Sequence, residues 1–228
     1  VYKRQAIYDA ERSATAALLD FYKVAVNGQF ETAVEAVKRF SQADAQRFLL
    51  RDNMRAEAIS QLLTETGSWY IEAGPIHYPL WAELKRRLPA GYPLKVTFLM
   101  ADAVREMGFR DHLYGPGDLL TLLHRLHPNS SDPREDLLAA RALIYNKMIA
   151  KEEIVDSTEP FPHTRDELHI GAIVRQLTMA DCRRLYSFVR RVNTESAREM
   201  VRHYLTRKRD TADRENSKAS GASPPVAE

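Results

Sequence analysis

The sequence predicts an all-α protein, and three observations support this fold class. Most segments between turns repeat their apolar residues every three or four positions, the spacing that gives a helix one apolar face. Only nine of the 228 residues are glycine, and runs of β-branched residues are few, which argues against a sheet protein. Helix-starting signatures, in which Ser, Thr or Asp is followed three residues later by Asp or Glu, recur along the chain. We expect about nine or ten helices in a multi-helix bundle or helical array.

The first helix is expected over residues 7–25, where apolar residues recur at helical spacing. Asn27 and Gly28, which tolerate the left-handed conformation, should end it. A second, shorter helix is predicted over residues 30–40. The preceding pentapeptide, residues 1–5, is typical of a translated sequencing adapter, so we expect it to be a non-native leader.

A third helix is predicted to start at Ser41, whose side chain can accept a hydrogen bond from the amide of Asp44. Gly67 should close this helix. Because the connections are short, the three helices are expected to form an N-terminal bundle over residues 6–67.

Residues 68–93 break the helical period and predict an irregular, aromatic linker with one short helix at 80–88. Its aromatic side chains could line a ligand or partner surface, although such residues more often anchor a loop to the core. These side chains are Trp69, Tyr70, His77, Tyr78 and Trp81.

A larger helical part is expected over residues 94–209. Its first segment, 94–107, begins with strand-like alternation and continues with helical spacing; its length favours a helix. A leucine-rich helix should follow the turn at 115–118. The run Asp132-Pro133-Arg134-Glu135 is the clearest helix start, and that helix is expected to reach about Lys151.

The last three helices each have a predicted N-terminal cap. Thr164 with Glu167, and Thr178 with Asp181, form capping-box patterns, and Asn193 or Thr194 should cap the final helix. From Asp210 onward large apolar residues are nearly absent, which predicts a disordered tail over residues 210–228.

Several functional classes find no support in the sequence. Phosphate-binding glycine loops, dinucleotide fingerprints, hydrolase elbows and kinase signatures are missing, and we expect no cofactor. The single cysteine, Cys182, excludes an internal disulfide framework and favours a structural thiol in a reducing, cytoplasmic setting. No run is apolar enough to cross a bilayer, so no membrane association is expected.

The strongest functional signal is the charge of residues 183–209. This window carries eight Arg and one Lys against two Glu, a charge of +7, whereas the whole chain carries only +2. Arginine suits phosphate groups because its planar guanidinium donates two parallel hydrogen bonds. We therefore predict a nucleic-acid surface on two helices, Met179–Val192 and Glu195–Lys208. Its residues are Arg183, Arg184, Arg190, Arg191, Arg198 and Arg202, with Tyr186 and Tyr204 available to stack on bases.

Other interpretations of the basic helices stay open. They could meet an acidic protein partner, which would make the chain an adaptor or assembly subunit, or they could be a solvated face. A helix-turn-helix is disfavoured because the breaks are very short and lack glycine.

The stretch Leu177–Val192, with Arg183-Arg184-Leu185-Tyr186 and Val189-Arg190-Arg191, resembles one helix in the small helical subunits of type III CRISPR effector complexes. The resemblance implies a helix that lines a nucleic-acid groove. It covers sixteen residues, lacks the glutamine usual in that helix and lies nearer the C-terminus than the family pattern, so it assigns no family.

Three charges, Glu11, Asp52 and Arg141, fall within apolar stripes and are expected to be buried. Their usual role would be an interhelical ion pair, and the alternative is a polar pocket of an enzyme. His124 and His127 could face one metal ion, but no third ligand follows from the sequence, so ordinary histidines are favoured and no metal site is predicted.

Overall fold

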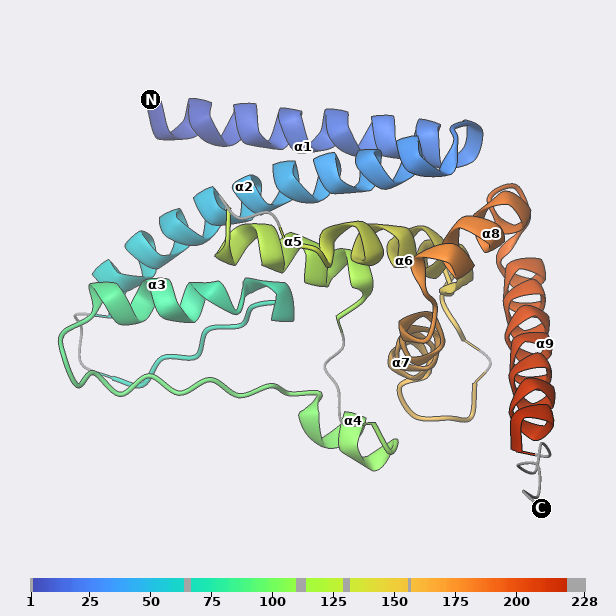
Figure 1. Ribbon diagram of the computed structural model, residues 1–228. Helices are drawn as coiled ribbons and strands as arrows, with labels where there is room; N and C mark the ends of the chain where they lie inside the picture. The colour runs from blue at the N-terminus through green and yellow to red at the C-terminus, as the bar shows by residue number, and fades with distance from the viewer. Residues whose placement is uncertain (1, 64–66, 110–113, 129–131, 156, 221–228) are drawn as a thin grey trace, which may run out of the picture.

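The computed structural model describes residues 2–63, 67–109, 114–128, 132–155 and 157–220. This part of the chain contains helices and no strands, which confirms the predicted all-α class (Figure 1). The helices are α1 (Tyr2–Asn27), α2 (Phe30–Leu62), α3 (Pro79–Arg87), α4 (Ala101–Glu106), α5 (Pro116–Leu126), α6 (Glu135–Met148), α7 (Pro162–Arg175), α8 (Met179–Val189) and α9 (Thr194–Ser220), with a 3-10 turn at Pro75–His77.

The helices α1 and α2 form a long hairpin along one side of the molecule (Figure 1). Its turn depends on Gly28, whose amide donates to the Val24 carbonyl at 2.7 Å. A Cβ atom at Gly28 would lie 2.7 Å from a Val24 methyl group, so only glycine fits this turn without a shift.

The predicted helix start at Ser41 is wrong, because α2 continues through it without a break. Ser41 and Asp44 are both buried in the middle of the helix. The Asp44 carboxylate pairs with Arg47 at 2.6 Å instead of capping an amide. The expected three-helix bundle is therefore a two-helix hairpin.

The main core joins α1 and α2 to helices that follow much later in the sequence. Phe21 and Phe30 belong to the same buried cluster as Leu120, Met148 and Leu185. Residues 6–67 and 94–209 thus share one core. A small second cluster, formed by Ala56, Leu80 and Leu84, packs α3 against the C-terminal half of α2.

Local signals for the later helices are confirmed at some positions. Asp181 accepts from the Thr178 amide at 2.8 Å, and the Thr178 hydroxyl accepts from the Asp181 amide at 3.2 Å. Asn193 caps α9 by accepting from the Ser196 amide at 2.9 Å. Helix α9 continues through Asp210, the predicted start of the tail, and ends at Ser220; residues 221–228 lie outside the described part.

Other boundaries differ from the expectation. The predicted helix over 94–107 is wrong for its first half, which is irregular chain ending in a turn, because only Ala101–Glu106 is α-helical. Helix α7 starts at Pro162, after Phe161 in the left-handed conformation with φ 53°, so the predicted cap at Thr164 lies inside the helix. The helix predicted from Pro133 begins at Glu135, although Glu135 still accepts from the Asp132 amide at 3.1 Å.

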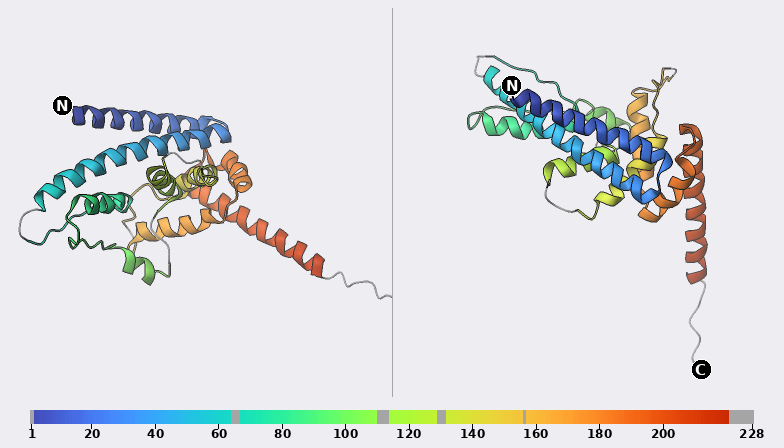
Figure 2. Two further views of the ribbon diagram at one scale, coloured as in Figure 1. Left: turned by 60° about the vertical axis from the view of Figure 1, so that its left-hand side comes forward. Right: turned by 90° about the horizontal axis from the view of Figure 1, so that it is seen from above.

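Helix α9 projects from the body of the molecule (Figure 2). Its N-terminal half packs against the core through Ala197, Val201 and Leu205, while residues 206–211 are exposed. Within the described residues, no helix combines the length and apolar character needed to span a membrane.

Candidate nucleic-acid interface

The predicted basic helices are α8 and α9, and they pack as a hairpin around one buried carboxylate. Asp181 is 4% exposed and accepts from the Tyr204 hydroxyl and the Lys208 ammonium, each at 2.6 Å. Burial alone would raise the pKa of Asp181, but the hydrogen bonds from Lys208, Tyr204 and Thr178 outweigh it and hold the pKa far below its ordinary value. The start of α8 is thereby fixed beside the middle of α9.

Two of the predicted phosphate-binding arginines are used to hold the fold together. Arg190 donates to the Gly28 carbonyl at 2.6 Å, at the turn of the α1–α2 hairpin. Arg198 donates to the Met148 carbonyl at 2.6 Å and to Asp166 at 2.7 Å. The assignment of these two side chains to an open phosphate surface is wrong, because their guanidinium groups already bind oxygens at the ends of other helices.

The predicted stacking role of Tyr186 is also wrong. Its ring is buried against Phe30, and its hydroxyl lies 3.0 Å from the Ala25 carbonyl at the end of α1. Tyr204 is half-buried, and the Arg184 guanidinium lies over its ring, 5.8 Å from the centroid.

The remaining predicted arginines are exposed but do not form one surface. Arg183 pairs with Glu31 of α2 at 2.8 Å. Arg202 is two residues before Tyr204, and such residues point about 200° apart on an α-helix. Arg202 therefore lies on the opposite side of α9 from the ring that Arg184 covers.

The exposed groups along the α8–α9 hairpin define a narrower surface, which we call the hairpin strip. On the α8 side, Arg184, Phe188 and Arg191 follow one another at spacings of four and three residues. On α9, Met200, Tyr204 and Arg207 have the same spacings. The contact of Arg184 with Tyr204 brings the two rows together.

Phe188, Met200 and Arg207 are residues of this strip that were not among the predicted site residues, and Phe188 is the most exposed apolar one. Its position in the helical period places it with Leu185 and Val189, which are buried. In the structure the Phe188 ring is 58% exposed. The signal that could have found it is the excess of apolar residues on α8 over what one buried stripe needs.

The three charges from the apolar stripes do not meet. Glu11 is half-buried and pairs with Arg47 and Arg51 of α2, at 3.3 and 3.2 Å. Arg141 donates to main-chain carbonyls at the end of α7. The alternative of one polar pocket that joins Glu11, Asp52 and Arg141 is therefore wrong, whereas Glu11 forms the interhelical ion pair that the sequence favoured.

Asp52 has a different role, since it is fully buried and accepts from His77 Nδ1 at 2.7 Å. The His77 ring packs edge-on against Phe48. His77 thus anchors the aromatic linker to α2, as expected for one of its aromatic residues. Trp69 and Tyr70 remain exposed, and Tyr78 stacks on Trp81.

The described residues offer no metal site. No three His, Cys, Asp or Glu side chains are grouped there as metal ligands would be. His124 is buried, which lowers its pKa. Burial raises the pKa of the Cys182 thiol to about 12, so the thiol is inert at neutral pH.

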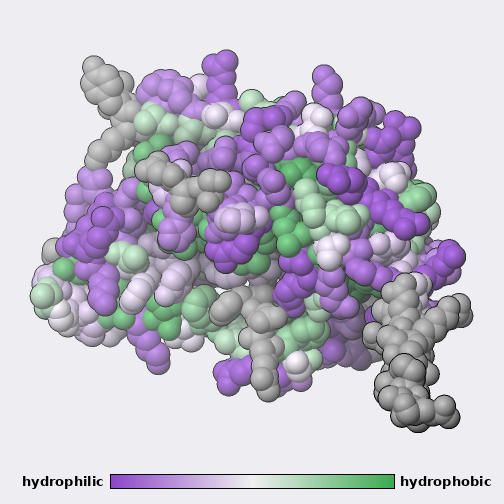
Figure 3. Space-filling view, in the orientation of Figure 1, coloured by the Kyte–Doolittle hydropathy of each residue, from purple (hydrophilic) through white to green (hydrophobic). Residues whose placement is uncertain are grey.

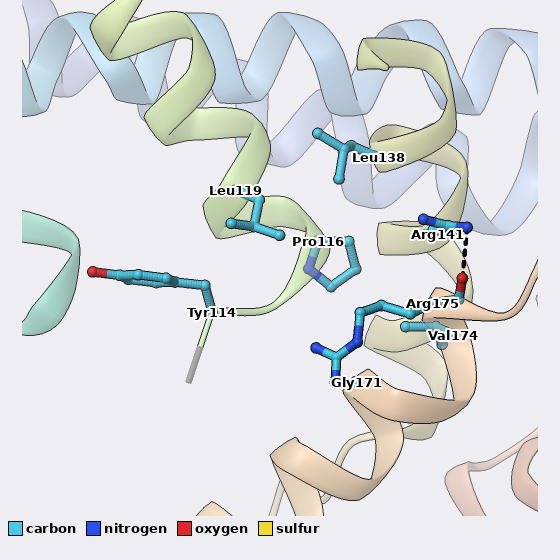
Figure 4. A pocket seen from close by; sticks show the side chains of 8 residues that line it. All are labelled: Tyr114, Pro116, Leu119, Leu138, Arg141, Gly171, Val174 and Arg175. Atoms are coloured by element: carbon cyan, nitrogen blue, oxygen red, sulfur yellow. Dashed lines mark hydrogen bonds between the residues drawn. The ribbon is translucent and has the colours of Figure 1, made fainter. Parts of the chain in front are cut away.

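A cavity of about 110 Å³ lies between α5, α6 and α7 (Figure 4). Arg141 donates to the Arg175 carbonyl at its edge, at 2.6 Å. The lining is mainly apolar, and the volume is below the roughly 300 Å³ typical of ligand pockets. The lining residues are Tyr114, Pro116, Leu119, Leu138, Arg141, Gly171, Val174 and Arg175.

No protein-family model and no solved structure matches this chain. A protein of Archaeoglobus fulgidus, named "Uncharacterized protein", is 31% identical over 181 residues. The matched region makes up 79% of this chain and 61% of that relative, so the chain spans less than two thirds of the relative's length. The likeness supports a shared ancestry for the matched region and names no activity.

Proposed function

We propose that the protein binds nucleic acid without sequence specificity, through the hairpin strip on α8 and α9. The observation that carries the proposal is the exposed Phe188 ring on α8, with the exposed cation Arg184 on the same helix and the exposed Arg191 two residues after its end. Guanidinium groups bind phosphates, and an open aromatic face stacks on an unpaired base.

The geometry favours a single strand over a duplex. A stacking residue needs a base whose face is free, which a duplex does not offer without unpairing. The exposed Arg184 and Arg191 flank Phe188 along the chain, and the exposed Arg207 follows Tyr204 on α9, so these cations can follow a sugar–phosphate backbone. Arg190 and Arg198 support the site indirectly, because they hold the hairpin against α1, α6 and α7.

The test is fluorescence anisotropy with labelled single-stranded RNA, single-stranded DNA and duplex DNA, at low and at physiological salt. The variant Arg184→Glu with Arg207→Glu should bind much more weakly, and the salt dependence of its residual binding should be shallower by about one per lost phosphate contact. Phe188→Ala should weaken single-strand binding by about tenfold, because stacking contributes roughly 1–3 kcal/mol per base.

A matched control keeps the change in net charge but moves it elsewhere. Lys95→Glu with Arg202→Glu alters two exposed cations outside the hairpin strip. This variant should bind nearly as well as the wild type. Equal losses in the two double variants would show that net charge alone drives binding, and the strip would then be discarded as the site.

A second candidate is an adaptor that binds an acidic partner through the same strip. The exposed apolar residues Phe188 of α8 and Met200 of α9, the latter 39% accessible, favour it, because apolar side chains among cations suit an amphipathic acidic helix. Absence of nucleic-acid binding at low salt, together with strip-dependent capture of an acidic protein, would select this function instead.

A further inference from the structure

Helix α1 carries a second apolar face that nothing in the described structure covers. Ala14 and Phe21 face inward and are buried. On the other side, large apolar residues lie open to solvent: Tyr8 is 62% exposed, Leu19 62%, Tyr22 57% and Val26 45%. Figures 1 and 2 show α1 as the outermost helix, lying along α2.

The spacing of this face is that of a coiled coil. Its positions follow one another at intervals of four, three, four, three and four residues, and they are Tyr8, Arg12, Thr15, Leu19, Tyr22 and Val26. Alternation of three and four is the spacing by which a helix presents one seam to another helix. A helix that packs once needs only one such stripe, and α1 has two.

We propose that α1 pairs with α1 of a second copy of this chain, antiparallel, through these six positions. A two-fold axis near residue 17 brings each large side chain opposite a smaller or complementary one. Tyr8 then faces Val26 of the second copy, and the small Thr15 faces Leu19.

The charges on α1 favour this orientation. In the antiparallel register Arg12 lies opposite Tyr22, where a guanidinium can sit on the aromatic ring. A parallel pair would instead place Arg12 against Arg12, and like charges in one layer repel. Asp9 and Lys23, which are exposed and border the seam, come opposite each other across the antiparallel pair.

The seam stays open because the contacts of α1 are made chiefly with α2, on its other side. The edge of the molecule along which α1 lies shows apolar residues between hydrophilic ones (Figure 3). The hairpin strip belongs to α8 and α9 and shares no residue with the seam.

The first experiment measures the mass of the 228-residue chain by sedimentation equilibrium, from about 1 to 100 µM. The wild type should approach twice the monomer mass of 26.1 kDa. Leu19→Glu with Tyr22→Glu should remain a monomer with unchanged helical circular dichroism. The control Leu99→Glu with Val155→Glu, two exposed apolar residues elsewhere, should still dimerise. A wild type that is monomeric throughout overturns the proposal.

Exchanging the charges of Asp9 and Lys23 tests the antiparallel register of the seam without removing apolar surface. Asp9→Lys should weaken the dimer by about tenfold, because symmetry creates two repulsive pairs with Lys23. The double variant Asp9→Lys with Lys23→Asp should restore wild-type association. A double variant as weak as the single one would overturn the antiparallel register.

Cross-linking decides the orientation independently, in a Cys182→Ala background. A mixture of Tyr8→Cys and Val26→Cys chains should form a disulfide-linked pair under mild oxidation, whereas neither variant alone should. Efficient self-linkage of Tyr8→Cys chains would show a parallel pair and contradict the proposal.

Discussion

Replacing Asp181 with alanine should destabilise the fold, because this carboxylate joins the start of α8 to the middle of α9. It accepts from the Thr178 amide that starts α8 and from Tyr204 and Lys208 of α9. The main-chain bond contributes about 0.5–1 kcal/mol, as helix caps do. The bond from the half-buried Tyr204 hydroxyl to a charged oxygen contributes roughly 1.5–3 kcal/mol. Lys208 is 45% exposed and adds less than about 1 kcal/mol.

The expected loss in the free energy of unfolding is therefore about 2–4 kcal/mol, with a fall in Tm of roughly 5–15 °C. Urea titration followed by circular dichroism measures the first quantity, and calorimetry measures the second. Asp210→Ala on exposed α9 is the control and should change stability by less than about 0.5 kcal/mol. A loss below about 1 kcal/mol for Asp181→Ala would refute the idea that this carboxylate holds the hairpin.

The Asp181 carboxylate also makes the free energy of unfolding depend on pH. Because the folded-state pKa of Asp181 is depressed, its contribution is fully present above the ordinary value of 3.8 and is lost as pH falls through the folded pKa. The stability difference between wild type and Asp181→Asn should be constant from about pH 5 to 7 and shrink in more acidic solution. A difference that grows toward low pH would contradict this assignment.

Three further predictions test the fold. Gln42→Pro should lower the free energy of unfolding, measured with urea, by about 3 kcal/mol because α2 is continuous at this position. A helix that started at Ser41 would tolerate proline there, so an unchanged stability would contradict the continuous helix. Cys182 should react with a thiol reagent only after denaturant is added, because the thiol is buried and its pKa is raised. Rapid labelling of the native protein would show instead that the thiol is accessible. His77→Ala should lower the free energy of unfolding, measured by heat or urea, by about 3–5 kcal/mol, because it leaves the Asp52 carboxylate buried without its partner. A decrease under about 1 kcal/mol would mean that Asp52 is not buried as a charge.

Part of this structure follows from neighbouring residues alone. The cap formed by Thr178 and Asp181, and the turn at Gly28, depend on side chains within four positions of one another. The apolar period likewise predicts the all-α class and most of the helices. These features could be derived from the sequence because the groups that interact are adjacent along the chain.

The same local pattern fails where burial decides the outcome. Ser41 and Asp44 match the capping signature as Thr178 and Asp181 do, yet α2 runs through them, because its inner face must reach the core without interruption. The aromatic residues of α8 show a similar limit. The helical period does not predict that Tyr186 is buried against the end of α1 while Phe188 is exposed.

The candidate site, like the fold, could be predicted only in part from the sequence. Composition and spacing predicted the basic segment, because charge is a property of the sequence itself. Which arginines remain available was decided by the tertiary structure. Arg190 and Arg198 bind carbonyl oxygens of residues 162 and 50 positions away along the chain, and no local pattern encodes such distances. A guanidinium binds whichever oxygens the fold brings near it, and long-range packing alone determines which these are.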